Sequence, residues 1–286
     1  MSIIERALQK NRNGKISNNA PRVSRPARKT EADPSLVRAA TAEGIPAELR
    51  IRSSPLDLDR EICRSHRLLI EGDPDNDVGA VAAYRMLRTR LLHRARAKEW
   101  TTIAVTSAGP NDGKTLTALN LAFSMAREKS RDIILLDMDM RNPSICRTLG
   151  VEPNRELRSY LETTSSIDGL LFSVGKDNLY IAGSITPTEH ASELLSSPRF
   201  EQLIWDLKQG AVDPVVLIDL PPVLVTDDAL VVAPKIDAVL VVASEGQTAR
   251  ADLDKALNLL SEFPIAGVVL NRAAETTRGY DYGYKA

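Results

Sequence analysis

The sequence predicts an α/β fold in which a mostly parallel β-sheet is covered by helices on both faces. Six short runs rich in Val, Ile and Leu are the predicted strands: 102–108, 133–139, 178–183, 215–220, 238–244 and 265–271. Segments with helical spacing of apolar residues lie between most of these runs. Hydrophobic residues make up 43% of the chain but aromatic residues only 4%, which fits the aliphatic core of a sheet buried on both faces.

Length and composition narrow the possible classes of protein. The 286 residues suffice for one large α/β domain plus an appendage. The formal net charge of -1 gives no reason to expect a nucleic-acid partner. Cys63 and Cys146 lack metal-ligand spacing, so we expect two reduced thiols. The first residues lack the long apolar segment of a secretory signal, and no apolar run reaches the length of a membrane span. We therefore expect a cytoplasmic protein.

Residues 1–60 are predicted to be a flexible N-terminal extension. A short amphipathic helix is expected at 2–10, because Ser2 and Glu5 form a capping box ahead of an apolar face. A helix of this length is marginal in water, so it either docks on a partner or frays. The basic stretch at 21–29 is interpreted as a solvated linker, with contact to anionic lipid or phosphate as the alternative.

Residues 61–100 are predicted to be a helical lead-in to the main domain. The strongest part is 78–98, where apolar residues recur at helical spacing and arginines project between them. Trp100 follows this helix directly, and the α/β pattern begins after it. The main domain is expected to span 101–274.

A phosphate-binding loop is predicted between the first strand of that domain and the helix that follows. The sequence Ser-Ala-Gly-Pro-Asn-Asp-Gly-Lys-Thr at 107–115 fits the P-loop pattern, except that Ala108 stands at the first Gly position. Such loops direct backbone N–H groups and a helix N-terminus at phosphate oxygens. Lys114 is expected to bridge the β- and γ-phosphates of ATP, and the Thr115 hydroxyl to bind Mg²⁺. The predicted ATP-binding residues of this segment are Ala108, Gly109, Pro110, Asn111, Asp112, Gly113, Lys114, Thr115 and Leu116.

Carboxylates follow two of the predicted strands. Asp137 and Asp139 are two residues apart, so an extended chain directs both toward one crevice. Asp219 ends another strand and precedes two prolines, as a Walker B acid would. Ligands of open α/β sheets bind at the edge of the sheet where the carboxyl ends of the parallel strands lie. We therefore expect Thr115, Asp137, Asp139 and Asp219 to hold the metal, partly through water, and Lys114, Asp137 and Asp139 to be catalytic.

The last residues, 275–286, form a tyrosine-rich tail that carries half of the six tyrosines in the chain. Tyr280, Tyr282 and Tyr284 alternate with Gly, Asp and Lys, which leaves no apolar face to bury. The tail could fold onto the surface or pair as an edge strand. Beside a nucleotide site, a flexible phosphoacceptor is the better explanation. A phenol has a pKa of about 10 and needs a base to lose its proton, and Asp137 is the candidate.

Together these motifs resemble the bacterial tyrosine kinases of exopolysaccharide and capsule systems, which use a P-loop, a DxDxR motif and an acid followed by Pro-Pro. Further matches are the segment at 191–197, the strand ending at Asn271-Arg272 and the tyrosine tail. The resemblance implies a P-loop NTPase fold of the MinD/ParA type, autophosphorylation between neighbouring copies and Asn271 near the adenine. It also implies activation by a membrane chain-length-determinant protein (a polysaccharide co-polymerase) that recruits the chain to the inner face of the membrane. Shorter matches at 2–10 and 56–60 resemble the exosortase-associated subgroup.

One departure from that family concerns self-association. Relatives assemble rings through a helix with Glu, two residues, Arg, two residues and Arg. Here Ala82 takes the Glu position while Arg85 and Arg88 remain, so a ring must use other contacts or does not form.

Two other functions remain open from the sequence. A partitioning or positioning ATPase of the same superfamily would carry a signature Lys where this chain has Gly109, and would lack the tyrosine tail. A nucleotide-binding regulatory module without tyrosine transfer is disfavoured by the retained Lys114 and carboxylates, but the sequence does not exclude it.

Overall fold

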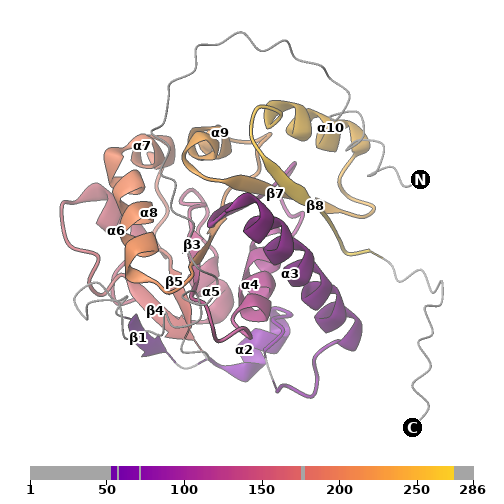
Figure 1. The fold of residues 1–286 in the computed structure, drawn as a ribbon, viewed down its shortest axis with the longest axis horizontal. Helices are drawn as coiled ribbons and strands as arrows, with labels where there is room; N and C mark the ends of the chain where they lie inside the picture. The colour runs from indigo at the N-terminus through magenta and orange to yellow at the C-terminus, as the bar shows by residue number, and fades with distance from the viewer. Residues whose placement is uncertain (1–52, 57, 71, 175–177, 274–286) are drawn as a thin grey trace, which may run out of the picture. The chain divides into compact units, whose positions relative to one another are not determined.

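The computed structural model describes residues 53–273 apart from 57, 71 and 175–177 (Figure 1). The helix predicted at 2–10, the basic stretch at 21–29 and the three tail tyrosines lie outside these residues.

A mostly parallel sheet forms the centre of the described chain. Its strand order is β1-β4-β5-β3-β6-β2-β7-β8, and the β4–β5 pair is antiparallel while every other neighbouring pair is parallel. The strands are β1 Ser53–Leu56, β2 Thr102–Ser107, β3 Ile133–Asp137, β4 Leu171–Val174, β5 Leu179–Ala182, β6 Val215–Asp219, β7 Ala238–Ser244 and β8 Ile265–Asn271.

The six predicted strands are present, each within about two residues of its expected ends, and two strands were not predicted. β4 has only four residues, and its sequence Leu-Phe-Ser-Val does not alternate regularly between apolar and polar residues. β1 lies in the segment predicted as flexible, and that prediction is wrong from Ser53 onward. Its sequence contains Pro55, which an edge strand tolerates because one side of its backbone has no strand partner among the described residues.

Helices connect the strands and cover the sheet. Their bounds are α2 Arg60–Ser65, α3 Val78–Lys98, α4 Lys114–Met125, α5 Ile145–Leu149, α6 Leu157–Glu162, α7 Ala191–Ser196, α8 Pro198–Gly210, α9 Asp228–Val232, the 3₁₀ helix η4 Ala233–Lys235 and α10 Arg250–Leu259. The helix predicted at 78–98 is confirmed as α3. Asp77 caps its N-terminus by accepting from Ala80 N, and Glu99 ends it in a left-handed conformation. None of the helices described here is long and apolar enough to cross a bilayer.

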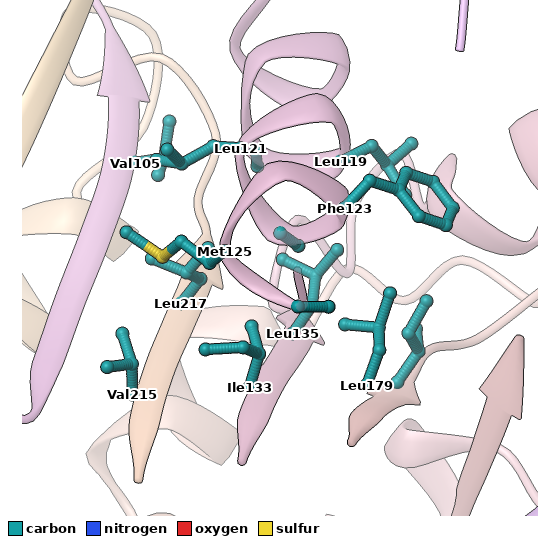
Figure 2. Close-up of a cluster of buried hydrophobic side chains, with 14 of the residues drawn as sticks. Val105, Leu119, Leu121, Phe123, Met125, Ile133, Leu135, Leu179, Val215 and Leu217 are labelled. Carbon is teal, nitrogen blue, oxygen red and sulfur yellow. The ribbon is translucent and has the colours of Figure 1, made fainter. Parts of the chain in front are cut away.

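Alternate residues of the central strands pack against opposite helix layers. Ile133 and Leu135 of β3 join the core beneath α3, α4 and α5, whereas Ile134 and Leu136 join the core beneath α6 to α10. Figure 2 shows α4 lying over the strands of the first core, with Leu121 and Met125 directed toward Val105 and Leu217. Because α4 starts at the phosphate loop, this packing holds the loop against the ends of β2, β3 and β6.

Candidate nucleotide site

The predicted phosphate loop joins β2 to α4 in the expected strand–loop–helix arrangement. Gly113 precedes α4 with φ of 88°, and Asn111 also has a positive φ of 62°. The Asp112 carboxylate is almost fully buried and accepts from Gly109 N at 3.0 Å, which closes the loop on itself. Ala108 is fully buried in the second core, so its methyl group points away from the loop interior. This explains how an alanine replaces the usual first glycine.

Lys114 and the three predicted carboxylates converge at the carboxyl edge of the sheet. Lys114 Nζ lies 2.7 Å from Asp139 Oδ2 and 3.7 Å from Asp219 Oδ2. β3 and β6 are adjacent strands, and Asp137 pairs in register with Asp219. The Thr115 hydroxyl donates to Asp219 Oδ2 at 2.5 Å. The sequence therefore identified a group of side chains that the fold brings into contact.

Asp137 is held by two backbone groups that the sequence did not reveal. Its Oδ2 atom accepts from Ser144 N and from Ile145 N, each at 2.9 Å. These N–H groups come from the start of α5, where a helix leaves donors without an internal acceptor. The other oxygen, Oδ1, is buried and has no hydrogen-bond partner among the described residues, and the same holds for Asp219 Oδ1.

Burial, and then the charges of neighbouring carboxylates, raise the pKa values of the two strand-end carboxyls. Desolvation, and then the charge of Asp219, raise the pKa of Asp137 to about 7. Desolvation likewise raises the pKa of Asp219 to about 6, against the lowering effect of Lys114. Desolvation lowers the pKa of Lys114, but Asp219 and Asp139 outweigh it, and the net direction is upward. Lys114 is therefore cationic, while Asp137 titrates near neutral pH.

The donor set fits a divalent cation that is shared with a nucleotide. Two buried carboxylate oxygens lack partners, and such atoms need a proton, a water or a cation. In the part of the chain that the structure describes, no three His, Cys, Asp or Glu side chains are grouped to enclose an ion by themselves. Mg²⁺ commonly uses one or two protein carboxylates together with substrate phosphates and waters. The roles of Thr115, Asp137, Asp139 and Asp219 as metal ligands stay predictions.

The end of β8 and the loop after β7 support the phosphate loop. Asn271 Nδ2 donates to the carbonyl oxygen of Asp112 at 2.9 Å, and Arg272 donates to that of Asn111 at 3.0 Å. Thr248, which the sequence analysis missed, donates to Asp112 Oδ1 at 2.6 Å. No local pattern identifies Thr248, because its partner lies 136 residues away. The contact of Asn271 with adenine stays a prediction.

We expect the substitution Gly113→Ala to abolish nucleotide binding. An added Cβ would lie 2.1 Å from Asn271 Nδ2, and the positive φ disfavours any side chain. Gly246→Ala is the matched control, because Gly246 has φ of 73° but nothing within 4 Å of an added Cβ. Titration with a fluorescent ATP analogue should show binding by Gly246→Ala and none by Gly113→Ala. Equal binding by both variants would contradict the clash.

The known proteins that are similar to this chain include P-loop NTPases and tyrosine-protein kinases. A family model described as ParA, NUBPL iron-transfer P-loop NTPase, matches residues 99–279. The tyrosine-protein kinase CpsD of Streptococcus pneumoniae serotype 4 is 34% identical over 178 residues, which are 59% of this chain and 75% of that protein. The tyrosine-protein kinase wzc of Salmonella typhimurium is 30% identical over 227 residues, which are 77% of this chain but only 30% of that protein.

Solved structures show the same fold. The kinase domain of VpsO superposes with a TM-score of 0.60 at 28% identity and covers 68% of this chain and 95% of that domain. The cell division ATPase MinD of Pyrococcus furiosus has a TM-score of 0.51 at 21% identity, and covers 62% of this chain and 74% of that one. At that identity the second similarity concerns the fold alone.

Proposed function

Because the chain belongs to the ParA-type P-loop NTPases and, among them, to the bacterial tyrosine-protein kinases of capsule and exopolysaccharide systems, we propose that it transfers the γ-phosphate of Mg·ATP to tyrosines of its own C-terminal tail. The observation that carries this proposal is the convergence of Lys114, Asp137, Asp139 and Asp219 beside the phosphate loop. A phosphate loop alone serves many reactions. A buried carboxyl with a pKa of about 7 next to it provides a base for a hydroxyl acceptor.

Each side chain has a distinct part in the proposed reaction. Backbone N–H groups of 109–115 bind the phosphates, and Lys114 offsets the charge that develops on the transferred phosphoryl group. Asp137, when ionised, accepts the proton of the tyrosine hydroxyl. Thr115, Asp137, Asp139 and Asp219 would hold a bound Mg²⁺, partly through water, and the ion would neutralise phosphate charge. Lys114 would then exchange its contact with Asp139 for contacts with phosphate oxygens.

Transfer between neighbouring copies and recruitment by a membrane chain-length-determinant protein complete the proposal. The contacts that join copies must differ from those of ring-forming relatives. Arg88 donates to Ser124 O at 2.9 Å and lies 3.7 Å from Glu128, so its own chain already provides partners for it. Ala82 is exposed and offers no carboxylate. Recruitment would place the chain at the inner face of the membrane.

A partitioning ATPase is not favoured. The relatives named above are tyrosine-protein kinases, whereas the similarity to MinD concerns the fold alone. Gly109 also occupies the position where such ATPases carry their signature lysine, and glycine provides no side-chain amine there. The assignment to the exosortase-associated subgroup stays a prediction.

We expect the three tail tyrosines to be the acceptors. A variant with Tyr280→Phe, Tyr282→Phe and Tyr284→Phe should lose its phosphotyrosine signal on a blot after incubation with Mg·ATP. A chain that ends at Gly279 should behave in the same way. Both variants should still bind the nucleotide, because their P-loop and carboxylates are intact. A phosphotyrosine signal that persists in both would place the acceptor elsewhere in the chain.

Mixing two inactive variants tests transfer between copies. The triple Phe variant keeps the catalytic site, and Lys114→Met keeps the acceptor tail. Neither should become labelled alone, whereas the mixture should label the Lys114→Met chain. A mixture that stays unlabelled, although wild-type protein labels itself, would indicate transfer within one chain.

A further inference from the structure

An ion pair between Asp228, which is buried, and Arg141, which is 35% exposed, links the segments that follow β3 and β6. Asp228 is fully buried at the start of α9, and its carboxylate accepts from Arg141 Nε at 3.0 Å and from a terminal guanidinium nitrogen at 3.4 Å. Arg141 lies in the loop after β3, two residues beyond Asp139. Asp228 lies in the segment that follows β6 and Asp219. The pair thus connects the segment that carries Asp139 with the segment that follows Asp219. This connection is separate from the ion pairs that Lys114 makes with the same two carboxylates.

Arg141 also holds the helix α7 in place. Its guanidinium donates to the carbonyl oxygen of Glu189 at 3.2 Å and to Ser192 Oγ at 3.1 Å. Ser192 Oγ in turn contacts Asp228 at 2.6 Å and Asp227 at 2.8 Å. The guanidinium therefore organises three segments at once, and its fixed planar arrangement of donors suits that task.

Near the carboxylates, few of the backbone hydrogen bonds given for the described residues join the segment after β3 to the end of β6. Met138 N donates to the carbonyl oxygen of Asp219 at 2.9 Å, and beyond it the chain of 139–144 leaves the sheet. Asp139 is therefore on a loop, while Asp219 ends a strand. A side-chain link from Arg141 to Asp228 restricts the position of the loop relative to that strand.

We propose that Asp228 is a positioning residue that, through Arg141, sets the separation of Asp139 and Asp219 and so the affinity of the site for a divalent cation with its nucleotide. This inference rests on the proposed function, since it concerns the same site. Partners that orient metal-binding side chains commonly change metal affinity about 10- to 100-fold when they are removed. Asp228 does not itself contact Lys114 or Thr115, so it acts only through the loop.

Substitution of Asp228 tests the inference with a matched neighbour as the control. Asp228→Asn keeps the shape of the side chain but loses the charge that holds Arg141. Asp227→Asn alters an exposed neighbouring carboxylate that accepts from Ser192 Oγ at 2.8 Å and acts on Arg141 only through its charge, without a hydrogen bond given for that pair. The affinity for a fluorescent ATP analogue is measured with Mg²⁺ and again with EDTA, without any acceptor tyrosine involved. Asp228→Asn should weaken binding about tenfold with Mg²⁺ and leave binding with EDTA unchanged, whereas Asp227→Asn should change neither.

A double variant tests whether the two residues act as one unit. Arg141→Gln alone should match Asp228→Asn, and the double variant should be no weaker than either, because both remove the same link. Losses that multiply, or an equal loss with EDTA, would overturn the proposal. If Asp228→Asn does not fold, Arg141→Gln alone serves instead, because the Arg141 side chain is 35% exposed and its loss leaves no cavity in the core. Unchanged Mg²⁺-dependent binding in Arg141→Gln would also overturn the proposal.

These results are separable from a failure of the proposed function. If the chain binds Mg·ATP but never labels tyrosine, the kinase proposal fails while the binding comparison still stands. If labelling occurs and Asp228→Asn binds Mg·ATP normally, only the positioning role is lost.

Discussion

Replacing Lys114 with Met is expected to lower the rate of tyrosine phosphorylation by about 10³-fold, to the background of the assay. Lys114 Nζ lies 2.7 Å from Asp139 and 3.7 Å from Asp219, and its side chain is only 13% exposed. Met has a similar length, so the variant loses the charge while much of the packing remains. Phosphotyrosine blotting of the purified protein measures the effect.

Lys129→Met is the matched control for that experiment. Lys129 is exposed and follows the C-terminal end of α4, whereas the phosphate loop precedes the N-terminal end of that helix. Its substitution should leave the phosphotyrosine signal unchanged. A signal in Lys114→Met that equals wild type would mean that another kinase in the preparation is responsible, or that Lys114 has no part in transfer. The second explanation would contradict the role given to Lys114, and the first would mean that the signal does not come from this chain.

Replacing Asp137 with Asn is expected to abolish transfer and, at the same time, to stabilise the protein without its ligands at pH 8. The loss of a general base commonly costs about 10²- to 10⁴-fold in rate. The gain in stability follows from the local geometry. Both backbone donors, Ser144 N and Ile145 N, bond to the same oxygen of Asp137. The single carbonyl oxygen of Asn can keep both bonds, while its amide group adds a donor where Oδ1 now has no partner.

The pKa of Asp137 sets the pH dependence of this stabilisation. Burial, and then the charge of Asp219, raise its pKa from 3.8 in the unfolded chain to about 7 in the folded protein. A raised carboxyl pKa favours folding while the group is protonated, so the stability it contributes is lost as pH rises from about 4 to about 7. The advantage of Asp137→Asn should therefore be largest above pH 7 and smallest near pH 4.

Thermal unfolding in EDTA without nucleotide measures this advantage. At pH 8 the variant should melt roughly 5 °C or more above wild type, because 1 kcal/mol shifts the melting temperature by about 2–4 °C in a domain of this size. At pH 5 the difference in melting temperature between the variant and wild type should be smaller. Measurement of both proteins at both pH values therefore provides the control. A variant that melts below wild type at pH 8 would contradict the conclusion that burial and the charge of Asp219 destabilise the ionised carboxylate of Asp137.

Local sequence patterns were enough to find the residues at the centre of the site. A glycine turn before Lys114 and an acid at the end of an aliphatic strand are contiguous signals, and the parallel arrangement brings strand ends to one edge. The same reasoning missed β4 and its antiparallel pairing with β5, because the sequence Leu-Phe-Ser-Val does not alternate regularly between apolar and polar residues. It also extended the flexible region over β1, whose Ser and Pro content resembles a linker.

The sequence by itself determined where six of the strands lie along the chain and where the phosphate loop lies. It also singled out Lys114, Asp137, Asp139 and Asp219 as candidate site residues. Each of these features depends on neighbours within a few residues. The tertiary structure alone decided which distant groups support them. Asp112 meets Thr248 across 136 residues, and Arg141 meets Asp228 across 87. The physical reason is that an isolated carboxylate or arginine in a sequence has many possible partners. Only the order of the strands in the sheet selects the partners, because β2 lies beside β7 and β3 lies beside β6, which brings the loops after each pair of strands together.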